Sequence, residues 1–307
     1  RISGRATSTL ANAMLMVMAV PRNPDTATPV DPMHLMARPD SKTGAFTIEG
    51  VPAGSYKVVA SSIVFAGDKV RTAIQDVDVV NADVDSVSLV VSRGVDVSGR
   101  VAFEGQAAAS ARNLRVSIRG RDEDFAFGSQ QEEDVEKEGS FTLTGLGDGT
   151  YTIRINSKCD ECYTKSATAS GTNLLETGLV VQSGQAPGSI EIVYSSNTGK
   201  AAGTVTGADD LPAPGSYVML VLASGVRDTE DNTKSATTDQ YGRFEIRGVP
   251  PRHYKALAWA KMDSGSTDDP EFVKPFLAKA DSLEVTTGAT AALQLKAIPT
   301  SAIEPSN

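Results

Sequence analysis

The 307-residue sequence predicts an all-β protein made of three β-sandwiches in tandem. Three observations support this prediction. A phrase of the form strand, tight turn, strand occurs three times along the chain. Short runs of alternating apolar and polar residues, typical of half-buried strands, fill much of the rest, and helical periodicity is almost absent. The length then divides into three units of about 100 residues, an ordinary domain size.

The repeated phrase reads GAFTIEGVPAGSY at residues 44–56, GSFTLTGLGDGTY at 139–151 and GRFEIRGVPPRHY at 242–254, with the same spacing from glycine to tyrosine. We call these segments the first, second and third corners. In each, apolar residues alternate with polar ones, a glycine then permits a tight turn, and a tyrosine opens the next strand. Such a tyrosine buries its ring and keeps its hydroxyl for a local backbone partner. The corner positions are Gly44, Phe46, Gly50 and Tyr56; Gly139, Phe141, Gly145 and Tyr151; and Gly242, Phe244, Gly248 and Tyr254.

Two further sequence segments recur in each unit and define the predicted domain boundaries. A small-residue segment containing Gly4, Gly99 or Gly203 begins each unit, and an alternating apolar segment ends it. Internal repetition of this kind defines the architecture before any other signal. The predicted domains are residues 1–94, 95–197 and 198–300, which we call the first, second and third repeats, followed by a C-terminal tail at 301–307. Because the junctions are short, we expect a semi-rigid rod.

One segment near the C-terminus predicts a short helix. Asp269 is suited to the N-cap, Pro270 to the first helical position and Glu271 to the first turn. We expect Pro275 to limit this helix. The segment is expected to lie in a loop that crosses one edge of the third sandwich.

The motifs SGRV, DQYGRFEIRGVPP and YKALAWA resemble the carboxypeptidase regulatory-like domain. The resemblance covers essentially the whole chain as three copies and implies a seven-stranded sandwich of the Ig-like, transthyretin-like kind, related to the B-type repeats of bacterial adhesins. It also implies a bacterial exported multi-repeat protein with further copies before Arg1. The motif is specific for fold, but fold alone does not define function.

Composition excludes several classes of partner. The formal net charge is −9, and no basic cluster interrupts the acidic balance. Nucleic acids and anionic membrane surfaces both require concentrated Lys and Arg, so neither is a predicted partner. No apolar run approaches the length needed to span a bilayer.

The two cysteines, Cys159 and Cys162, form the sequence CDEC after a predicted strand. A disulfide closing this short loop would contribute about 2 kcal/mol. A redox site would require a helix N-terminus in a thioredoxin-like context. A zinc site would require two further ligands, and the two histidines, His34 and His253, lie in other repeats. The disulfide interpretation favours an oxidising, extracytoplasmic compartment: secreted, cell-surface or periplasmic.

No cofactor is predicted, although two residue clusters offer metal chemistry. Met14, Met16 and Met18 alternate along a predicted strand, and the segment 33–36 adds two methionines and His34, a set that can bind Cu(I). The alternative is a strand whose two apolar faces are both covered.

Acidic segments at 122–124, 132–134 and 263–271 supply oxygen ligands of the kind that Ca²⁺ prefers. None has EF-hand spacing. Solvated, charged loops are the alternative interpretation.

The sequence predicts no enzyme. It lacks zinc-hydrolase, nucleophile-elbow and phosphate-loop motifs, and no nucleophile accompanies His253. We therefore expect a non-catalytic structural or interaction protein, used for surface display, adhesion or assembly, including assembly as a filament subunit. Its partners would be proteins or further copies joined through open edge strands or the tail. The alternative is a carbohydrate-binding or other ligand-binding module that uses Trp259 as a platform.

Overall fold

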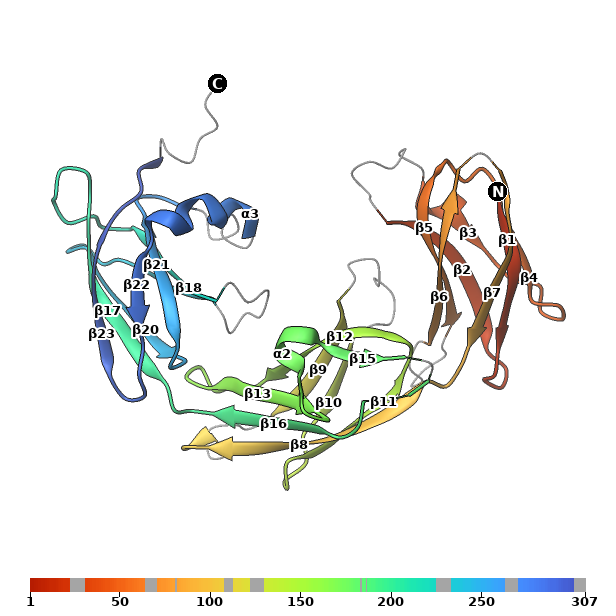
Figure 1. Cartoon of the computed structure of the whole chain (residues 1–307), viewed down its shortest axis with the longest axis horizontal. Coiled ribbons are helices and arrows are strands. Elements are labelled where there is room, and N and C mark those ends of the chain that lie inside the picture. The colour runs from red at the N-terminus through yellow and green to blue at the C-terminus, as the bar shows by residue number, and fades with distance from the viewer. Residues whose placement is uncertain are drawn as a thin grey trace. The chain divides into compact units, whose positions relative to one another are not determined.

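The computed structural model describes residues 1–22, 31–63, 71–80, 82–107, 113–121, 130–182, 184–185, 187–224, 233–262 and 270–300 (Figure 1). These residues are mostly strand and form six sheets of three to five strands. The predicted class, an all-β chain of tandem β-sandwiches, is confirmed. The tail at 301–307 and the acidic segment 122–124 lie outside the described residues.

The first repeat is a sandwich of a three-stranded and a four-stranded sheet, with strand orders β4-β1-β7 and β3-β2-β5-β6. The strands β1 and β7 run parallel, and the other pairs are antiparallel. Apolar residues on alternate positions of both sheets form one core, which includes Val17, Phe46 and Val58. The elements are β1 (Ile2–Ser8), β2 (Met14–Pro21), η1 (Pro32–Leu35), β3 (Met36–Ala37), β4 (Ala45–Ile48), β5 (Gly54–Ile63), β6 (Thr72–Val79) and β7 (Val84–Val91).

The third repeat has the same plan, with strand orders β20-β17-β23 and β19-β18-β21-β22. Again the first and last strands, β17 and β23, run parallel. Its core includes Val218, Phe244 and Leu295. The elements are β17 (Gly199–Thr206), β18 (Tyr217–Leu222), β19 (Thr233–Thr237), β20 (Arg243–Val249), β21 (His253–Trp259), α3 (Pro270–Val273), η4 (Lys274–Lys279), β22 (Asp281–Glu284) and β23 (Thr290–Lys296).

The second repeat contributes the remaining two sheets, with strand orders β10-β9-β12-β15 and β11-β8-β16-β13-β14. It has nine strands in the described residues, against seven in each of the other repeats, because β14 and β15 flank a short helix. Its elements are β8 (Val95–Glu104), β9 (Arg115–Gly120), β10 (Gln131–Asp134), β11 (Ser140–Leu146), β12 (Gly149–Asn156), β13 (Tyr163–Ala169), β14 (Thr172–Asn173), α2 (Leu174–Thr177), β15 (Leu179–Val181) and β16 (Ile190–Ser195).

The chain divides into two compact units, and the division passes through the second repeat. The first unit comprises residues 1–100, 115–153 and 168–191, and the second comprises 101–114, 154–167 and 192–307. The domain boundaries after residues 94 and 197 therefore stay a prediction.

A glycine on the first strand of each repeat lies directly opposite the corner phenylalanine. A Cβ on Gly4 would lie 2.0 Å from the carbonyl oxygen of Val87, and a Cβ on Gly203 would lie 1.9 Å from that of Leu293. Only glycine allows the parallel last strand to approach this closely, which explains the recurring glycine at the start of each repeat. The opposed pairs are Gly4 with Phe46, Gly99 with Phe141, and Gly203 with Phe244.

The predicted C-terminal helix is present, but its position differs from the expectation. The α-helix ends at Val273, and the chain continues past Pro275 as the 3-10 helix η4. Instead of crossing a sheet edge, the two helices cover the outer face of β18 and β21 (Figure 1). Both faces of these strands are apolar, so the sheet needs a covering layer on each side. Asp269, the predicted N-cap, lies outside the described residues.

Candidate functional site

The three corners share one local geometry. Each tyrosine is buried, and its hydroxyl donates a hydrogen bond to the backbone carbonyl four residues earlier. The donor–acceptor pairs are Tyr56 with Pro52 at 3.0 Å, Tyr151 with Gly147 at 2.9 Å and Tyr254 with Pro250 at 2.9 Å. This is the local backbone partner that the position of the tyrosine leads us to expect, and it fixes the turn against the strand that follows.

The glycine at the head of each turn has a left-handed backbone. The φ angles are +66° at Gly50, +68° at Gly145 and +63° at Gly248. A residue with a side chain would be strained by about 1–2 kcal/mol in this region. The three turns therefore share this left-handed glycine, but they differ two residues before the tyrosine, where Gly54 and Gly149 have φ angles of +159° and +154° and the third corner has Arg252.

A side chain of the first repeat covers the second corner. Arg71 precedes β6, and its Nη1 donates to the carbonyl oxygen of Gly145 at 2.9 Å and to that of Thr144 at 3.4 Å. The guanidinium lies against the bare Cα of Gly145, since a Cβ there would lie 2.1 Å from Arg71 Cζ. Both bonds come from the same nitrogen, Nη1, which carries two N–H groups in the plane of the guanidinium.

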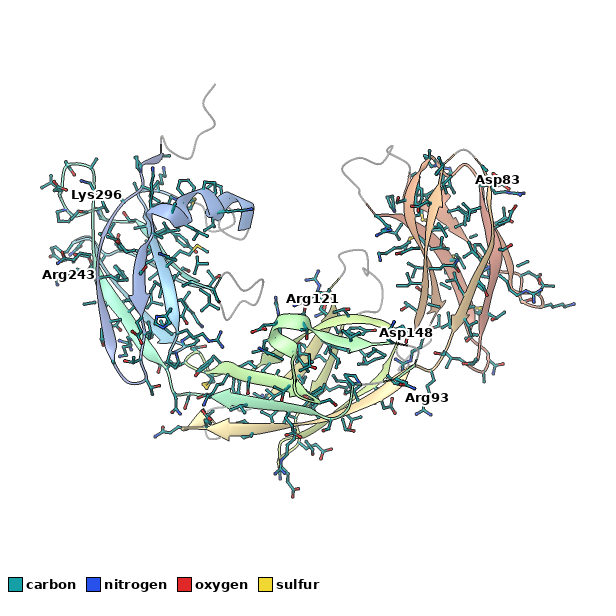
Figure 2. All side chains as sticks on the ribbon, viewed as in Figure 1. Asp83, Arg93, Arg121, Asp148, Arg243 and Lys296 are labelled. Atoms are coloured by element: carbon teal, nitrogen blue, oxygen red, sulfur yellow. A yellow bond between two sulfur atoms is a disulfide. The ribbon has the colours of Figure 1, made fainter. Side chains whose placement is uncertain are left out.

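The junction between the first and second repeats completes this contact. The Gly145 N–H donates to Asp96 Oδ1 at 2.8 Å. A Cβ on Gly94, which has a φ of +73°, would lie 2.5 Å from the carbonyl oxygen of Leu146. Figure 2 labels Arg93, which precedes Gly94 in the linker, and Asp148, which belongs to the second corner. The second corner is thus held by the linker as well as by Arg71.

Burial at the second corner raises the pKa of its tyrosine, Tyr151. The pKa of the Tyr151 phenol is raised to about 12, chiefly by burial and further by the negative charge of Asp148. Burial also raises the pKa of Tyr56, in the first corner. Both phenols are neutral hydrogen-bond donors at physiological pH.

The disulfide loop of the second repeat covers the third corner. Cys159 and Cys162 are joined by a disulfide with a Cα–Cα distance of 5.4 Å. A Cβ on Gly248 would lie 2.9 Å from the carbonyl oxygen of Asp160 and 3.0 Å from the Cα of Glu161. The loop between the two cysteines therefore rests directly on the glycine of the third corner.

The disulfide loop is itself anchored. Ser157 Oγ lies 2.6 Å from the hydroxyl of Tyr194, and the Cys159 N–H donates to the same Oγ at 3.1 Å. The pKa of Arg247 is raised chiefly by its hydrogen bond to Glu245, and the charge of Glu161 adds the smallest contribution. The loop thus contacts the third corner by its backbone and by charge.

The first corner differs from the other two in what covers it. Among the described residues, nothing lies within 4 Å of the position that a Cβ on Gly50 would occupy. Gly50 is exposed, whereas Gly145 and Gly248 are buried. The adjacent Glu49 and Ala53 are exposed as well. The first corner therefore presents an open turn whose glycine has the same left-handed φ as the glycines of the two covered turns.

The residues proposed as metal ligands have other roles in the structure. The segment 132–134 is part of β10 rather than a loop, and Arg115 binds Glu132 at 3.0 Å and Asp134 at 2.9 Å. His34 is exposed and lies 3.7 Å from Asp31. The described residues contain no group of three or more His, Cys, Asp or Glu side chains placed to hold a metal ion. Residues 263–269 lie outside the described part of the chain.

The methionines of β2 are half-buried on one face of the strand, while the residues between them point into the core. Met14 Sδ accepts a hydrogen bond from Arg38 at 3.3 Å. This arrangement matches the packing interpretation of the methionine row better than a copper site.

Trp259 is fully buried and cannot act as an exposed platform for a sugar ring. Its ring packs edge-on against Phe276 at a centroid distance of 5.8 Å and lies 6.4 Å from the ring of Tyr217. The helices α3 and η4 provide this cover. His253 is exposed at the start of β21, where its carbonyl accepts the N–H of Ala223.

Sequence reasoning missed the residues that cover the corners. These residues are ordinary charged residues near loops, and no motif distinguishes them. They are Arg71, Asp96, Asp160 and Glu161. The spacing of the corner glycines predicts the turns, but the covering contacts depend on how one repeat follows the next.

No family model matches the chain, and no curated protein matches it significantly. Among solved structures, the chain is similar to the Bacillus anthracis TIE protein, with 12% identity and a TM-score of 0.23 over 96% of this chain and 50% of that one. The chain thus spans about half the length of that protein.

Two further solved structures are similar to this chain. A streptococcal ancillary pilin has 11% identity and a TM-score of 0.30 over 94% of this chain and 98% of that one. Two B repeat units of the collagen-binding protein of Staphylococcus aureus have 11% identity and a TM-score of 0.22 over 95% of this chain and 73% of that one. At these values the likeness carries no information about what the chain binds. Within the described residues, no helix is both long and apolar enough to cross a membrane.

Proposed function

We propose that the chain is a non-catalytic structural or interaction protein: a row of β-sandwich repeats that works outside the cytoplasm in display, adhesion or assembly. One observation carries the proposal. The contact between Arg71 and Gly145, and the contact of the Cys159–Cys162 loop with Gly248, each place the end of one repeat on the corner of the next. Contacts of this kind limit the motion of one repeat against the next. A protein that acts as a spacer requires such limited motion.

The surface chemistry of the corners supports a holding role. They offer backbone carbonyls and a bare Cα, and these groups bind other backbones and cations but do not supply a nucleophile. Protein partners fit this chemistry better than nucleic acid, since the chain carries a net charge of −9. The sheets also have open edge strands, including β7 and β23, which offer a second surface for assembly.

The compartment follows from the disulfide. Bonds of this kind persist in oxidising surroundings, so we place the chain at the cell surface, in the periplasm or in the medium. The sequence resemblance to carboxypeptidase regulatory-like repeats of exported bacterial proteins supports the same assignment.

A measurement of the motion between the first and second repeats tests this proposal. Dyes on Lys42→Cys and Glu138→Cys, both exposed positions, report the distance between the repeats by single-molecule energy transfer. We expect a narrow distribution for the parent chain and a broader one for Arg71→Ala. Arg115→Ala, which removes an exposed cation bound to β10, is the control and should leave the distribution narrow. An equally broad distribution in the parent chain would show that the repeats are not coupled.

A further inference from the structure

The last strand of each repeat pairs with the first strand, and its other edge has a different cover in each repeat. In the second repeat, β13 pairs with this edge of β16. In the first repeat, Gln75 of β6 covers part of the edge of β7, since its Oε1 accepts the N–H of Ser88 at 3.0 Å. In the third repeat, β23 is the outer strand of its sheet, and within the described residues only β17 pairs with it.

The edge of β23 is also regular. Its pairing with β17 runs from Lys200 opposite Thr290 to Thr206 opposite Lys296 without a shift of register. The edge of β7 is interrupted, because Ser86 has a φ of +72° and the register with β1 shifts beside it. Bulges and covering side chains keep edge strands from pairing with other chains. The first repeat has both devices, and the described part of the third repeat has neither at this edge.

In the first two repeats, the cover comes from an earlier strand of the same repeat. The corresponding strand of the third repeat is β22, which has four residues where β6 has eight. Asp281 stands where Gln75 stands in the first repeat, because each pairs with the second residue after the corner tyrosine. Asp281 is exposed, and α3 and η4 lie on the other sheet. After β23 the chain returns to β21, where the N–H of Ile298 donates to the carbonyl of Ala258.

We propose that the outer edge of β23 pairs antiparallel with the same edge of a second copy of this chain. The three-stranded sheets of the two third repeats then continue into one sheet. The inference rests on the proposed function in one respect, namely that the chain works by assembly. It adds the partner, which is another copy, and the surface that meets it.

Every second residue of β23 presents its backbone to the outer edge. The carbonyl oxygen of Leu293 points at Gly203 of β17, where a Cβ would lie 1.9 Å from it. Because backbone groups alternate in direction along a strand, the N–H and C=O groups of Ala292 and Gln294 point away from β17. Both side chains are exposed and uncharged. This edge therefore offers a row of backbone donors and acceptors to a further strand.

The sequence of β23 fits pairing with itself. In the antiparallel register that pairs all seven of its residues, Ala292 lies opposite Gln294 of the second copy, and Thr290 lies opposite Lys296 of the second copy. Like charges directly opposite each other would destabilise the pair, and this register has none. Lys296, the one charged residue of the strand, forms an ion pair with Asp210 at 3.0 Å. The same surface is used on both copies, so the assembly stops at a dimer.

Sedimentation equilibrium on the full chain over a range of concentrations tests the proposal. We expect the weight-average mass of the parent chain to rise with concentration and to level off at twice the monomer mass. Gln294→Pro removes an outward N–H and should raise the dissociation constant by about tenfold or more, since the dimer loses two donors. Gln294→Ala keeps the N–H and should match the parent. A monomeric parent, or equal behaviour of the two variants, would overturn the proposal.

Cross-linking tests the register. Ala292→Cys and Gln294→Cys carry thiols that lie opposite each other only between two copies. Mild oxidation of a mixture of the two variants should give a covalent dimer with one chain of each, and either variant alone should give far less. Equal yields from the mixture and from the single variants would overturn the pairing. The energy-transfer experiment observes single molecules and does not involve β23, so its outcome bears on the proposed function alone.

Discussion

The first and third corners share a left-handed glycine and a bonded tyrosine but have opposite surroundings. Both have a glycine with φ near +65°, a buried phenylalanine and a tyrosine bonded to the carbonyl four residues before it. The glycine of the third corner lies under the disulfide loop, whereas that of the first is exposed. The comparison teaches that the repeated phrase encodes the turn alone, and that its cover is supplied by the preceding repeat.

Alanine at the corner glycines should give the largest effects and should separate the corners. Gly248→Ala combines the strain of a left-handed backbone, about 1–2 kcal/mol, with a clash against the backbone of the disulfide loop, for a total of roughly 2–5 kcal/mol. Gly50→Ala should cost only the strain. Gly145→Ala should lie between them, because the atoms it meets belong to the flexible end of Arg71.

Urea unfolding followed by two probes measures these differences. The chain's single tryptophan, Trp259, is buried in the third repeat, so its fluorescence reports that repeat. Circular dichroism reports all three repeats. We expect Gly248→Ala to shift the fluorescence transition and Gly50→Ala to leave it in place. Equal losses at Gly50 and Gly248 would contradict the difference in cover.

Removal of the disulfide should loosen the third corner selectively. Cys159→Ser together with Cys162→Ser should lower the stability of the second repeat by about 2 kcal/mol, the value for so short a loop. Hydrogen exchange should rise at residues 247–250, which the loop covers, and stay unchanged at residues 49–54. A uniform rise over both corners would mean that the loop does not act as a local cover.

Alkaline pH should lower the stability of the folded chain through Tyr151, in the second corner. The folded pKa of Tyr151, about 12, lies above the ordinary value of 10.0, so folding favours the neutral phenol. Its contribution to stability is complete below about pH 10 and is lost as the pH rises toward 12. Tyr151→Phe should therefore show a smaller loss of stability between pH 10 and 12 than the parent chain in urea unfolding. Identical slopes in the two chains would show that this phenol does not titrate with unfolding.

The smallest effect should come from Arg71→Lys. A lysine keeps the charge but lacks the planar guanidinium that lies against Gly145 and donates to the carbonyls of Thr144 and Gly145, so we expect a loss of about 1 kcal/mol. Differential scanning calorimetry of this variant beside Arg115→Lys, which alters an exposed ion pair, measures the difference. A larger loss for Arg115→Lys would argue against the role of Arg71.

The fold was predictable because its signals are local. The alternation around Phe46 predicts a strand, and Gly50 predicts a tight turn. Gly4 marks only the start of a repeat in the sequence, and the reason for it, a close approach of backbones, emerges from the parallel pairing of β1 with β7. The helix near residue 270 was predicted from its capping pattern. Its position on Trp259 was not, because that depends on the exposed apolar face of a sheet formed by distant strands.

The contacts that cover the second and third corners could not be predicted from the sequence, for a physical reason. Arg71 lies far from Gly145 along the chain, and the contact exists only once two sandwiches have formed and been joined at Gly94. The disulfide was predicted from the two cysteines alone, but its contact with the third corner was not. Local pattern thus defines each repeat, while the joints arise from tertiary structure.

Carbene footprinting of the native chain at high dilution tests the central claim most directly, since it reports solvent access at all three corners in one experiment. We predict strong labelling at residues 49–54 and weak labelling at 144–147 and 247–250. Equal labelling of the three segments would contradict the claim that each later corner is covered by the repeat before it.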